Sequence, residues 1–360
     1  MTKKNNVILG KLSRDRIDNS KIIALMNNKG GCGKTSTSIA LGMYLVRTGH
    51  NVLFWDNDPQ SNLTQRMGLS DNKCPDKRIN ILFASAHMAG FERDHRKLIS
   101  VVEYPFIYRM NKSIARPGKI GLMAGSHDAE IEANSADKKM GQKTFSEVEH
   151  KDIYKFFNST VQFYRNYFDY IIMDTAPAIE GNILNKLASR AVNEIIIPVD
   201  GIEAAFGMRT LLSWIVSQTR DFNGGSPPNI TFAMVKYQED SKRLGLDTST
   251  LRLRNSVYRA MKDAFGDYVC DQGVRETQTL RSVVSGFKGS KKTDYYALTQ
   301  EISEKLELPR ENIFKKINSN TFNGLESQLL ILQSKIQEKT PKFKSPYYTA
   351  LTEQTELNEP

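Results

Sequence analysis

The chain has 360 residues, of which 25% are charged and 39% hydrophobic, a balance typical of globular rather than fibrous or unstructured proteins. Its longest apolar runs are far shorter than the roughly 20 residues of a membrane span, and residues 1–16 lack the apolar core of a signal peptide. Three widely spaced cysteines argue against a disulfide framework or a zinc pair and favour a reducing compartment, the cytosol.

The formal net charge is +10, which indicates a polyanionic partner such as nucleic acid. A basic surface kept for solubility is the alternative, and composition does not decide between the two. Residues 1–20 are polar and basic, and we expect them to form a short arm. Twenty residues are too few for a helix-turn-helix domain.

A glycine-rich turn follows, reading KGGCGKTS at residues 29–36, between an apolar run at 22–26 and a segment with helical spacing at 39–46. Such a turn points backbone N–H groups into one concavity, and the helix N-terminus adds positive potential, so the site suits phosphate. Lys34 can reach the outer phosphates, and the Thr35 hydroxyl can ligate Mg²⁺. A glycine-rich turn that serves only for tight packing is the alternative. Glycines, lysine and threonine in this order nevertheless predict a nucleoside triphosphate site.

One departure from the general P-loop pattern is informative. Asn28 stands where that pattern has glycine, and a second lysine, Lys29, opens the turn. The motif resembles the deviant Walker A motif of the ParA/MinD family of ATPases, which implies that Lys29 acts on ATP held by a second subunit. The opening NNKGG is closer to ParA partition ATPases than to MinD-like proteins, which typically open with GKGG. The resemblance assigns ATP to Lys29, Gly30, Gly31, Cys32, Gly33, Lys34, Thr35 and Ser36.

The second motif is DNDPQ at residues 56–60, directly after a short apolar strand at 52–55. Asp56 and Asp58 lie two residues apart, so strand geometry turns both to one side, at the carboxyl end where open α/β sheets hold ligands. A turn that only ends the strand is the alternative. The segment resembles the family's A′ motif, which implies that Asp58 orients the hydrolytic water and that Asp56 supports Mg²⁺ through a bound water.

Residues 70–117 are irregular, and we expect an insertion there with one helix at 79–88. A strand is predicted at 119–123, a capped helix start in GSHDAEIEA at 125–133, and an amphipathic helix at 151–168. The apolar strand that follows ends in Asp174. This arrangement is typical of a Walker B motif, in which the carboxylate binds Mg²⁺ through water.

Later strands are predicted at 195–197 and 230–235, and they are followed by Pro198 and Lys236, for which we expect contacts with the adenine. Thr248 to Phe265 reads as a helix whose basic residues lie largely off its apolar side. Basic side chains there and beyond it could follow a DNA backbone without reading bases, and a solvated helix face is the alternative. The predicted DNA contacts are Arg252, Arg254, Arg259, Lys262, Arg281, Lys288, Lys291 and Lys292.

The resemblance covers roughly residues 21–308, which we expect to form the ATPase domain. Residues 309–360 fall outside it, as a helical extension and tail with an amphipathic helix at 323–339. That helix carries acids and glutamines and lacks interfacial aromatics, so it is a poor membrane binder. We expect its apolar side to pack in a dimer or on a partner.

Alternating strands and helices around a P-loop predict a doubly wound, mostly parallel sheet, as in P-loop NTPases of the deviant Walker A type. The resemblance implies a cytoplasmic, nucleoid-associated ATPase for plasmid or other DNA segregation, which forms a homodimer on binding ATP and Mg²⁺. Non-specific DNA and a ParB-like centromere-binding adaptor are the implied partners, the adaptor stimulating hydrolysis and release. A MinD-like membrane-surface regulator, a cargo-positioning ATPase and a small-molecule kinase or amidating enzyme are the alternatives.

Overall fold

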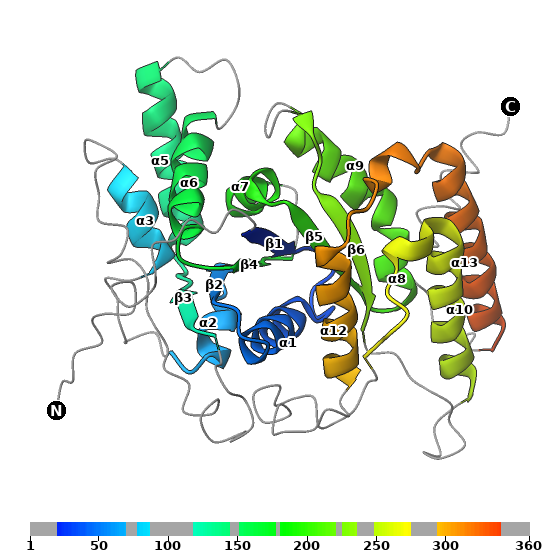
Figure 1. Cartoon of the computed structure of the whole chain (residues 1–360). Coiled ribbons are helices and arrows are strands. Elements are labelled where there is room, and N and C mark those ends of the chain that lie inside the picture. Colours follow the sequence, from blue (N-terminus) through cyan, green and yellow to red (C-terminus); the bar gives the residue numbers. More distant parts are fainter. Residues whose placement is uncertain are drawn as a thin grey trace, which may run out of the picture.

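The structure is a computed structural model that describes residues 20–69, 78–86, 118–144, 151–177, 181–220, 225–235, 248–274 and 294–339. Within these ranges six parallel strands form one sheet in the order β3-β2-β4-β1-β5-β6 (Figure 1). The predicted doubly wound parallel sheet is thereby confirmed. The strands are β1 (Lys21–Leu25), β2 (Val52–Asn57), β3 (Ile120–Met123), β4 (Tyr170–Thr175), β5 (Glu194–Val199) and β6 (Asn229–Met234).

Helices cover both faces of this sheet. Those described are α1 (Lys34–Arg47), α2 (Asn62–Arg66), α3 (Ile79–Ala86), α5 (Ala129–Thr144), α6 (Lys151–Tyr164), α7 (Ile183–Ala191), α8 (Gly201–Phe206), α9 (Met208–Thr219), α10 (Thr248–Phe265), α12 (Asp294–Glu307) and α13 (Ser319–Lys339). Short 3₁₀ turns lie at η6 (Gly266–Tyr268) and η8 (Ile313–Lys315). None of these helices is long and apolar enough to cross a membrane.

Successive side chains of each buried strand point to opposite faces of the sheet, so a hydrophobic core lies on each face. Ile22 and Ala24 of β1 face the core under α5, α6, α7 and α9, whereas Ile23 and Leu25 face the core under α1 and α12 (Figure 1). A strand that is buried on both faces reads as a continuous apolar run, which is why residues 22–26 show no polar alternation.

The P-loop helix α1 lies unusually close to β2. A Cβ atom built on Gly42 would lie 2.2 Å from Cζ of Phe54, so only glycine permits this approach. On its other side, Tyr44 meets Tyr296 of α12 edge to face, with ring centroids 5.3 Å apart. The helix is therefore fixed between the sheet and α12, and its N-terminus is fixed with it.

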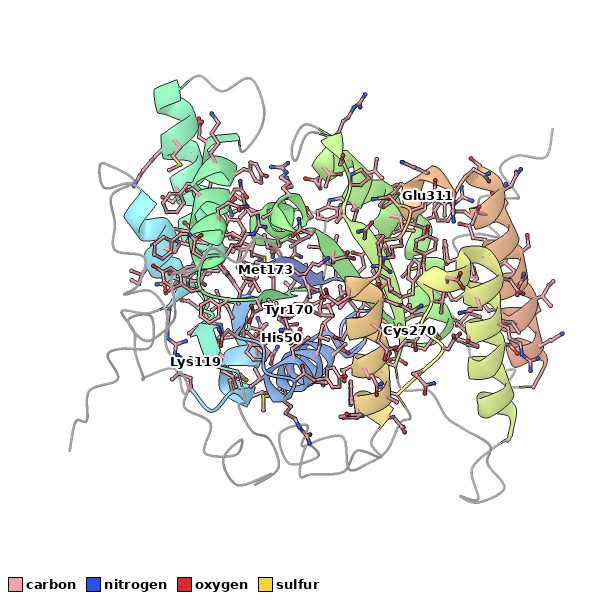
Figure 2. All side chains as sticks on the ribbon, viewed as in Figure 1. His50, Lys119, Tyr170, Met173, Cys270 and Glu311 are labelled. Carbon is pink, nitrogen blue, oxygen red and sulfur yellow. The ribbon has the colours of Figure 1, made fainter. Side chains whose placement is uncertain are left out.

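The opposite end of α12 is attached to the amino end of β4. The Tyr170 hydroxyl donates to Glu307 Oε1 at 2.6 Å, and its ring meets His50 edge to face with centroids 5.1 Å apart. Figure 2 shows His50 beside Tyr170 below the sheet. The amino end of β4 lies away from the carboxyl ends of the strands, where a ligand is expected.

The C-terminal helix differs from its prediction. It begins at Ser319 rather than Asn323, and Phe322, Leu325 and Leu329 are buried in the chain's own core. Helix α13 packs on α10 and α8, beside α10 in Figure 1. The prediction that its apolar side packs on a partner is therefore wrong for this described part, because α10 and α8 supply the apolar surface that covers it.

Candidate nucleotide site

The loop between β1 and α1 has the backbone of a phosphate-binding turn. Gly31 and Gly33 adopt φ angles of 71° and 90°, a left-handed conformation that side chains disfavour. A Cβ atom at Gly33 would also lie 3.4 Å from Val235 Cγ2, directly after β6. Helix α1 then begins at Lys34, so its unpaired N–H groups line the turn.

Lys34 lies across this turn and is only 6% exposed. Its ammonium group donates to the carbonyl oxygens of Asn27 and Lys29 at 3.1 and 3.2 Å, and the buried Cys32 Sγ lies 4.0 Å away. Asn27 anchors the loop, since its Nδ2 donates to the Pro198 carbonyl at 2.6 Å and its Oδ1 accepts from the Lys29 N–H at 2.9 Å. Sequence reasoning gave Asn27 no such role.

Asp56 and Asp174 lie side by side, at paired positions on the neighbouring strands β2 and β4, and both are fully buried. Burial raises the pKa of Asp56 to about 8, and the neighbouring Asp174 carboxylate adds to this rise. Burial raises the pKa of Asp174 to about 6, while hydrogen bonds from the Thr35 and Ser38 hydroxyls act in the opposite direction. Two buried carboxylates this close require a cation when both are charged.

Asp174 provides the best evidence for a metal site. Its Oδ1 accepts from the Ser38 hydroxyl at 3.0 Å, whereas its buried Oδ2 has no hydrogen-bond partner among the described residues. An unpaired oxygen on a carboxylate that interacts with the Thr35 hydroxyl fits Mg²⁺ or a water bound to it. The described ranges contain no group of three or more His, Cys, Asp or Glu side chains placed to hold a metal ion, so phosphate and water would supply the other ligands.

The two acids of the DNDPQ motif have surroundings that differ from those of Asp174. Both oxygens of Asp56 accept hydrogen bonds, Oδ2 from the N–H and hydroxyl of Thr64 at 2.8 and 2.6 Å and Oδ1 from the Asp58 N–H at 3.3 Å. Asp56 therefore fits a supporting position behind Asp174. Asp58 is 6% exposed, and its Oδ1 accepts from the Gln60 N–H at 2.9 Å, so it lies in the turn beside both acids.

A network that no motif indicated holds Asp56 in place. The Gly125 N–H donates to Thr64 Oγ1 at 2.8 Å, and Arg78 Nη1 donates to the Gly125 carbonyl at 2.8 Å. A Cβ atom on Gly125 would lie 2.8 Å from both Asp56 Oδ2 and Ser61 Oγ. The only sequence signal for this contact is a glycine two residues after an apolar strand. The helix start predicted beyond it is confirmed in α5.

Lys29 projects away from Lys34. Its Nζ lies 3.1 Å from Glu203 Oε2 and donates to the Asp200 carbonyl at 3.3 Å, both at the start of α8. The loop motif predicted a function for Lys29 but gave no indication of Glu203, because the two are far apart in the sequence.

The predicted DNA contacts are only partly described. Arg259 is exposed on α10, whereas Lys262 on the same helix donates to Asp271 Oδ1 at 2.6 Å and to the Val269 carbonyl at 3.1 Å. Arg252 and Arg254 belong to α10, but their side chains lie outside the described residues. Also outside them are Lys236, predicted to contact adenine, and the predicted DNA contacts Arg281, Lys288, Lys291 and Lys292.

Comparison with known protein families matches residues 20–224, more than half of the chain, to AAA_31, described as an AAA domain. The chain belongs to this family. Among relatives of this AAA_31 chain, the chromosome-partitioning ATPase Soj of Treponema pallidum is 27% identical over 200 residues, which are 56% of this chain and 65% of that protein. The sporulation initiation inhibitor protein Soj of Bacillus subtilis is 53% identical over 49 residues, 14% and 19% of the two chains. The chain thus spans less than two thirds of either relative's length.

Solved structures resemble the AAA_31 chain at low identity. Cobyrinic acid a,c-diamide synthase from Mycobacterium smegmatis, with bound ATP analog and magnesium, has a TM-score of 0.56 at 16% identity, over 81% of this chain and 98% of that one. The pNOB8 ParA bound to nonspecific DNA has a TM-score of 0.51 at 20% identity, over 80% and 99%. At these identities the likeness shows a shared fold alone. The family match and the Soj relatives confirm the resemblance to ParA-type ATPases.

The two buried acids predict how stability depends on pH. Without metal and nucleotide, the folded state keeps protons on Asp56 and Asp174 that the unfolded chain releases near the ordinary pKa of 3.8. The free energy of unfolding should therefore fall as pH rises from about 4 to about 8, by no more than about 1.4 kcal/mol per pH unit for each proton. Asp56→Asn should flatten this slope and stabilise the protein at about pH 8.

Urea unfolding of the metal-free protein at about pH 5, 6.5 and 8 measures this effect. Asp263→Asn, on the exposed side of α10, is the matched control for loss of one carboxylate. A slope that Asp56→Asn leaves unchanged would contradict the raised pKa of this residue.

Proposed function

We propose that the chain is an ATPase of a DNA partition system, which dimerises on binding ATP and Mg²⁺, binds DNA without sequence preference and leaves it after hydrolysis. The observation that carries the proposal is one arrangement: the loop with Lys34, the buried pair of Asp56 and Asp174, and Lys29 paired with Glu203 outside that loop. Two relatives are Soj proteins, one named a chromosome-partitioning ATPase, and one structural neighbour is a ParA bound to nonspecific DNA.

In this proposal each residue has a separate task. The α1 N-terminus and Lys34 neutralise the phosphates, and Thr35 with Asp174 holds Mg²⁺, which would offset negative charge on the phosphates. Asp58 orients the attacking water, and Lys29 completes the site of the partner subunit. Pro198 and Lys236 are proposed to contact the adenine.

We further propose the cytoplasm and the nucleoid as the location and a ParB-like adaptor as the activator. The net charge of +10 and the exposed Arg259 support a DNA partner. In domain terms we propose a basic arm at 1–20, an ATPase domain at 21–308 with an insertion at about 70–117, and an extension at 309–360. Within that extension, α13 packs on helices of the ATPase domain.

The test is DNA binding with ATP, with ADP and without nucleotide, at two salt concentrations and on two unrelated duplexes. We expect tight binding with ATP alone, equal on both duplexes and much weaker at the higher salt. Binding to anionic vesicles without binding to DNA would instead favour a membrane-surface regulator. ATP turnover that needs a small substrate and ignores DNA would favour a metabolic enzyme.

Arg259 and Lys262 of α10 are expected to contribute differently to DNA binding. Arg259→Ala should weaken binding alike on all sequences and lower the slope of log affinity against log salt by about 0.9 for each phosphate that the protein no longer neutralises. Lys262→Ala should have a smaller effect, because its ammonium already pairs with Asp271 at 2.6 Å. Fluorescence anisotropy across a salt series measures both slopes.

Lys155→Ala, which removes an exposed cation from α6, is the control for net charge alone. If Arg259→Ala and Lys155→Ala change the slope equally, the positive charge of α10 has no special place in DNA binding.

A further inference from the structure

A cavity of about 700 Å³ lies beside the nucleotide loop, between the loop, helices α8 and α9, and the C-terminal helix α13. It is lined by Lys29, by Arg209 and Glu326, and by the apolar Phe206 and Leu330. Helix α13 lies outside residues 20–224, which match the family, and it borders the loop.

At the loop end, Lys29 is held within its own subunit. Glu203 Oε2 lies 3.1 Å from its ammonium group, and the Asp200 carbonyl accepts from it at 3.3 Å. Glu203 belongs to α8, a helix of six residues whose last turn leads through Gly207 directly into α9. Helix α8 packs on α10 and α13 through the buried Ala204 and Ala205, and the position of Glu203 depends on this packing and on what holds the α8–α9 bend.

The bend is held from α13 by a two-point contact. Arg209, in the first turn of α9, donates from Nε and Nη2 to the two oxygens of Glu326 at 2.7 and 3.1 Å, and from Nη2 to Asn323 Oδ1 at 2.6 Å. Its guanidinium lies 5.1 Å from the ring centroid of Phe322. Hydrogen bonds from two nitrogens of a planar guanidinium to both oxygens of a carboxylate, here called the Arg209 fork, fix the orientation of the pair as well as its distance. A lysine contact would not fix the orientation.

We infer that Arg209 and Glu326 are positioning residues for Lys29. Helix α13, with Leu325 and Leu329 buried in the core, packs on α10 and on α8, and the Arg209 fork adds a directional contact from α13 to the α8–α9 bend. Glu203 is thereby kept where it retains Lys29 in its own subunit. The consequence for dimer formation rests on the proposed function, in which Lys29 must leave Glu203 to reach the partner's nucleotide.

The expected change in how tightly Lys29 is held depends on how exposed the Arg209–Glu326 ion pair is. Arg209 and Glu326 are 38% and 34% exposed, and ion pairs of this kind shift an equilibrium by about twofold to fivefold. Breaking the fork loosens Glu203 without touching the residues that bind phosphate. Lys29 should therefore spend more time free, and ATP-dependent self-association should need correspondingly less protein.

The experiment measures both consequences in the full chain. Competitive acylation of the nucleotide-free protein, read by mass spectrometry and normalised to Lys155, reports how free the Lys29 amine is. Arg209→Gln and Glu326→Gln should each raise its acylation rate about twofold to fivefold, and the exchange of Arg209→Glu with Glu326→Arg should restore part of the original rate. Sedimentation velocity with ATP should show the midpoint of self-association falling by a similar factor.

Glu311→Gln is the matched control, since it removes an exposed pair with Lys316 in the same C-terminal region but away from α9. Unchanged Lys29 acylation in Glu326→Gln, with a normal melting temperature, overturns the inference. Glu326→Gln keeps the shape of its side chain, so it decides the matter even where Arg209→Gln fails to fold. A wild-type chain that stays monomeric with ATP while acylation rises in the variants refutes the proposed dimer and leaves the positioning role standing.

Discussion

Replacing Lys34 with alanine is expected to abolish ATP turnover and to weaken ATP binding by at least about a hundredfold. Lys34 is a buried cation of the loop, and its ammonium group donates to two carbonyl oxygens, with Cys32 Sγ 4.0 Å away. A phosphate would give it a charged partner in a site shielded from water, where one such contact contributes about a hundredfold to a thousandfold in rate.

The same change should have only a small effect on folding. The carbonyls of Asn27 and Lys29 each lose one hydrogen bond, worth about 1 kcal/mol, and the loop remains anchored by Asn27 on Pro198. Titration with a fluorescent nucleotide and phosphate release measure binding and turnover. Lys155→Ala on α6 is the control, and turnover retained in Lys34→Ala would show that the nucleotide binds elsewhere.

Local patterns were sufficient to predict the nucleotide loop and the fold class. A strand buried on both faces reads as an apolar run, and a loop with glycines at positive φ has few substitutes, so β1, the loop and α1 appear where residues 22–46 indicated. Each motif predicted its own aspartate at the carboxyl end of a strand, Asp56 on β2 and Asp174 on β4. That the two lie side by side depends on the pairing of two strands far apart in the sequence, which no local pattern contains.

Most of the contacts that sequence reasoning missed join residues that are distant in the sequence. Glycine at position 125 is required because Asp56 lies against it, and Asp56 is 69 residues earlier in the chain (125 − 56). The amphipathic pattern of α13 indicated an apolar side but not that α10 and α8 cover it. Basic residues on α10 looked equivalent in sequence, whereas Asp271 neutralises Lys262 and Arg259 stays exposed.

Replacing Lys29 with alanine is expected to give the opposite pattern to Lys34→Ala. ATP should still bind, because Lys34 and the N–H groups of the loop are intact, but turnover and ATP-dependent dimers should be lost. The Lys29 ammonium group contacts Glu203 and the Asp200 carbonyl, away from its own phosphate site, so its absence leaves that site unchanged. Sedimentation velocity with ATP and phosphate release measure the two effects.

Mixing two inactive variants tests whether Lys29 acts on a second subunit. Asp58→Asn should bind ATP and retain Lys29 but lack the group that orients water, whereas Lys29→Ala retains Asp58. In a mixed dimer, the Lys29→Ala site would receive Lys29 from the Asp58→Asn subunit and would contain every catalytic group. The mixture should therefore recover turnover that neither variant has alone. If the mixture stays inactive while mixed dimers form, Lys29 serves its own subunit's site, because a lysine acting within one subunit cannot restore the other.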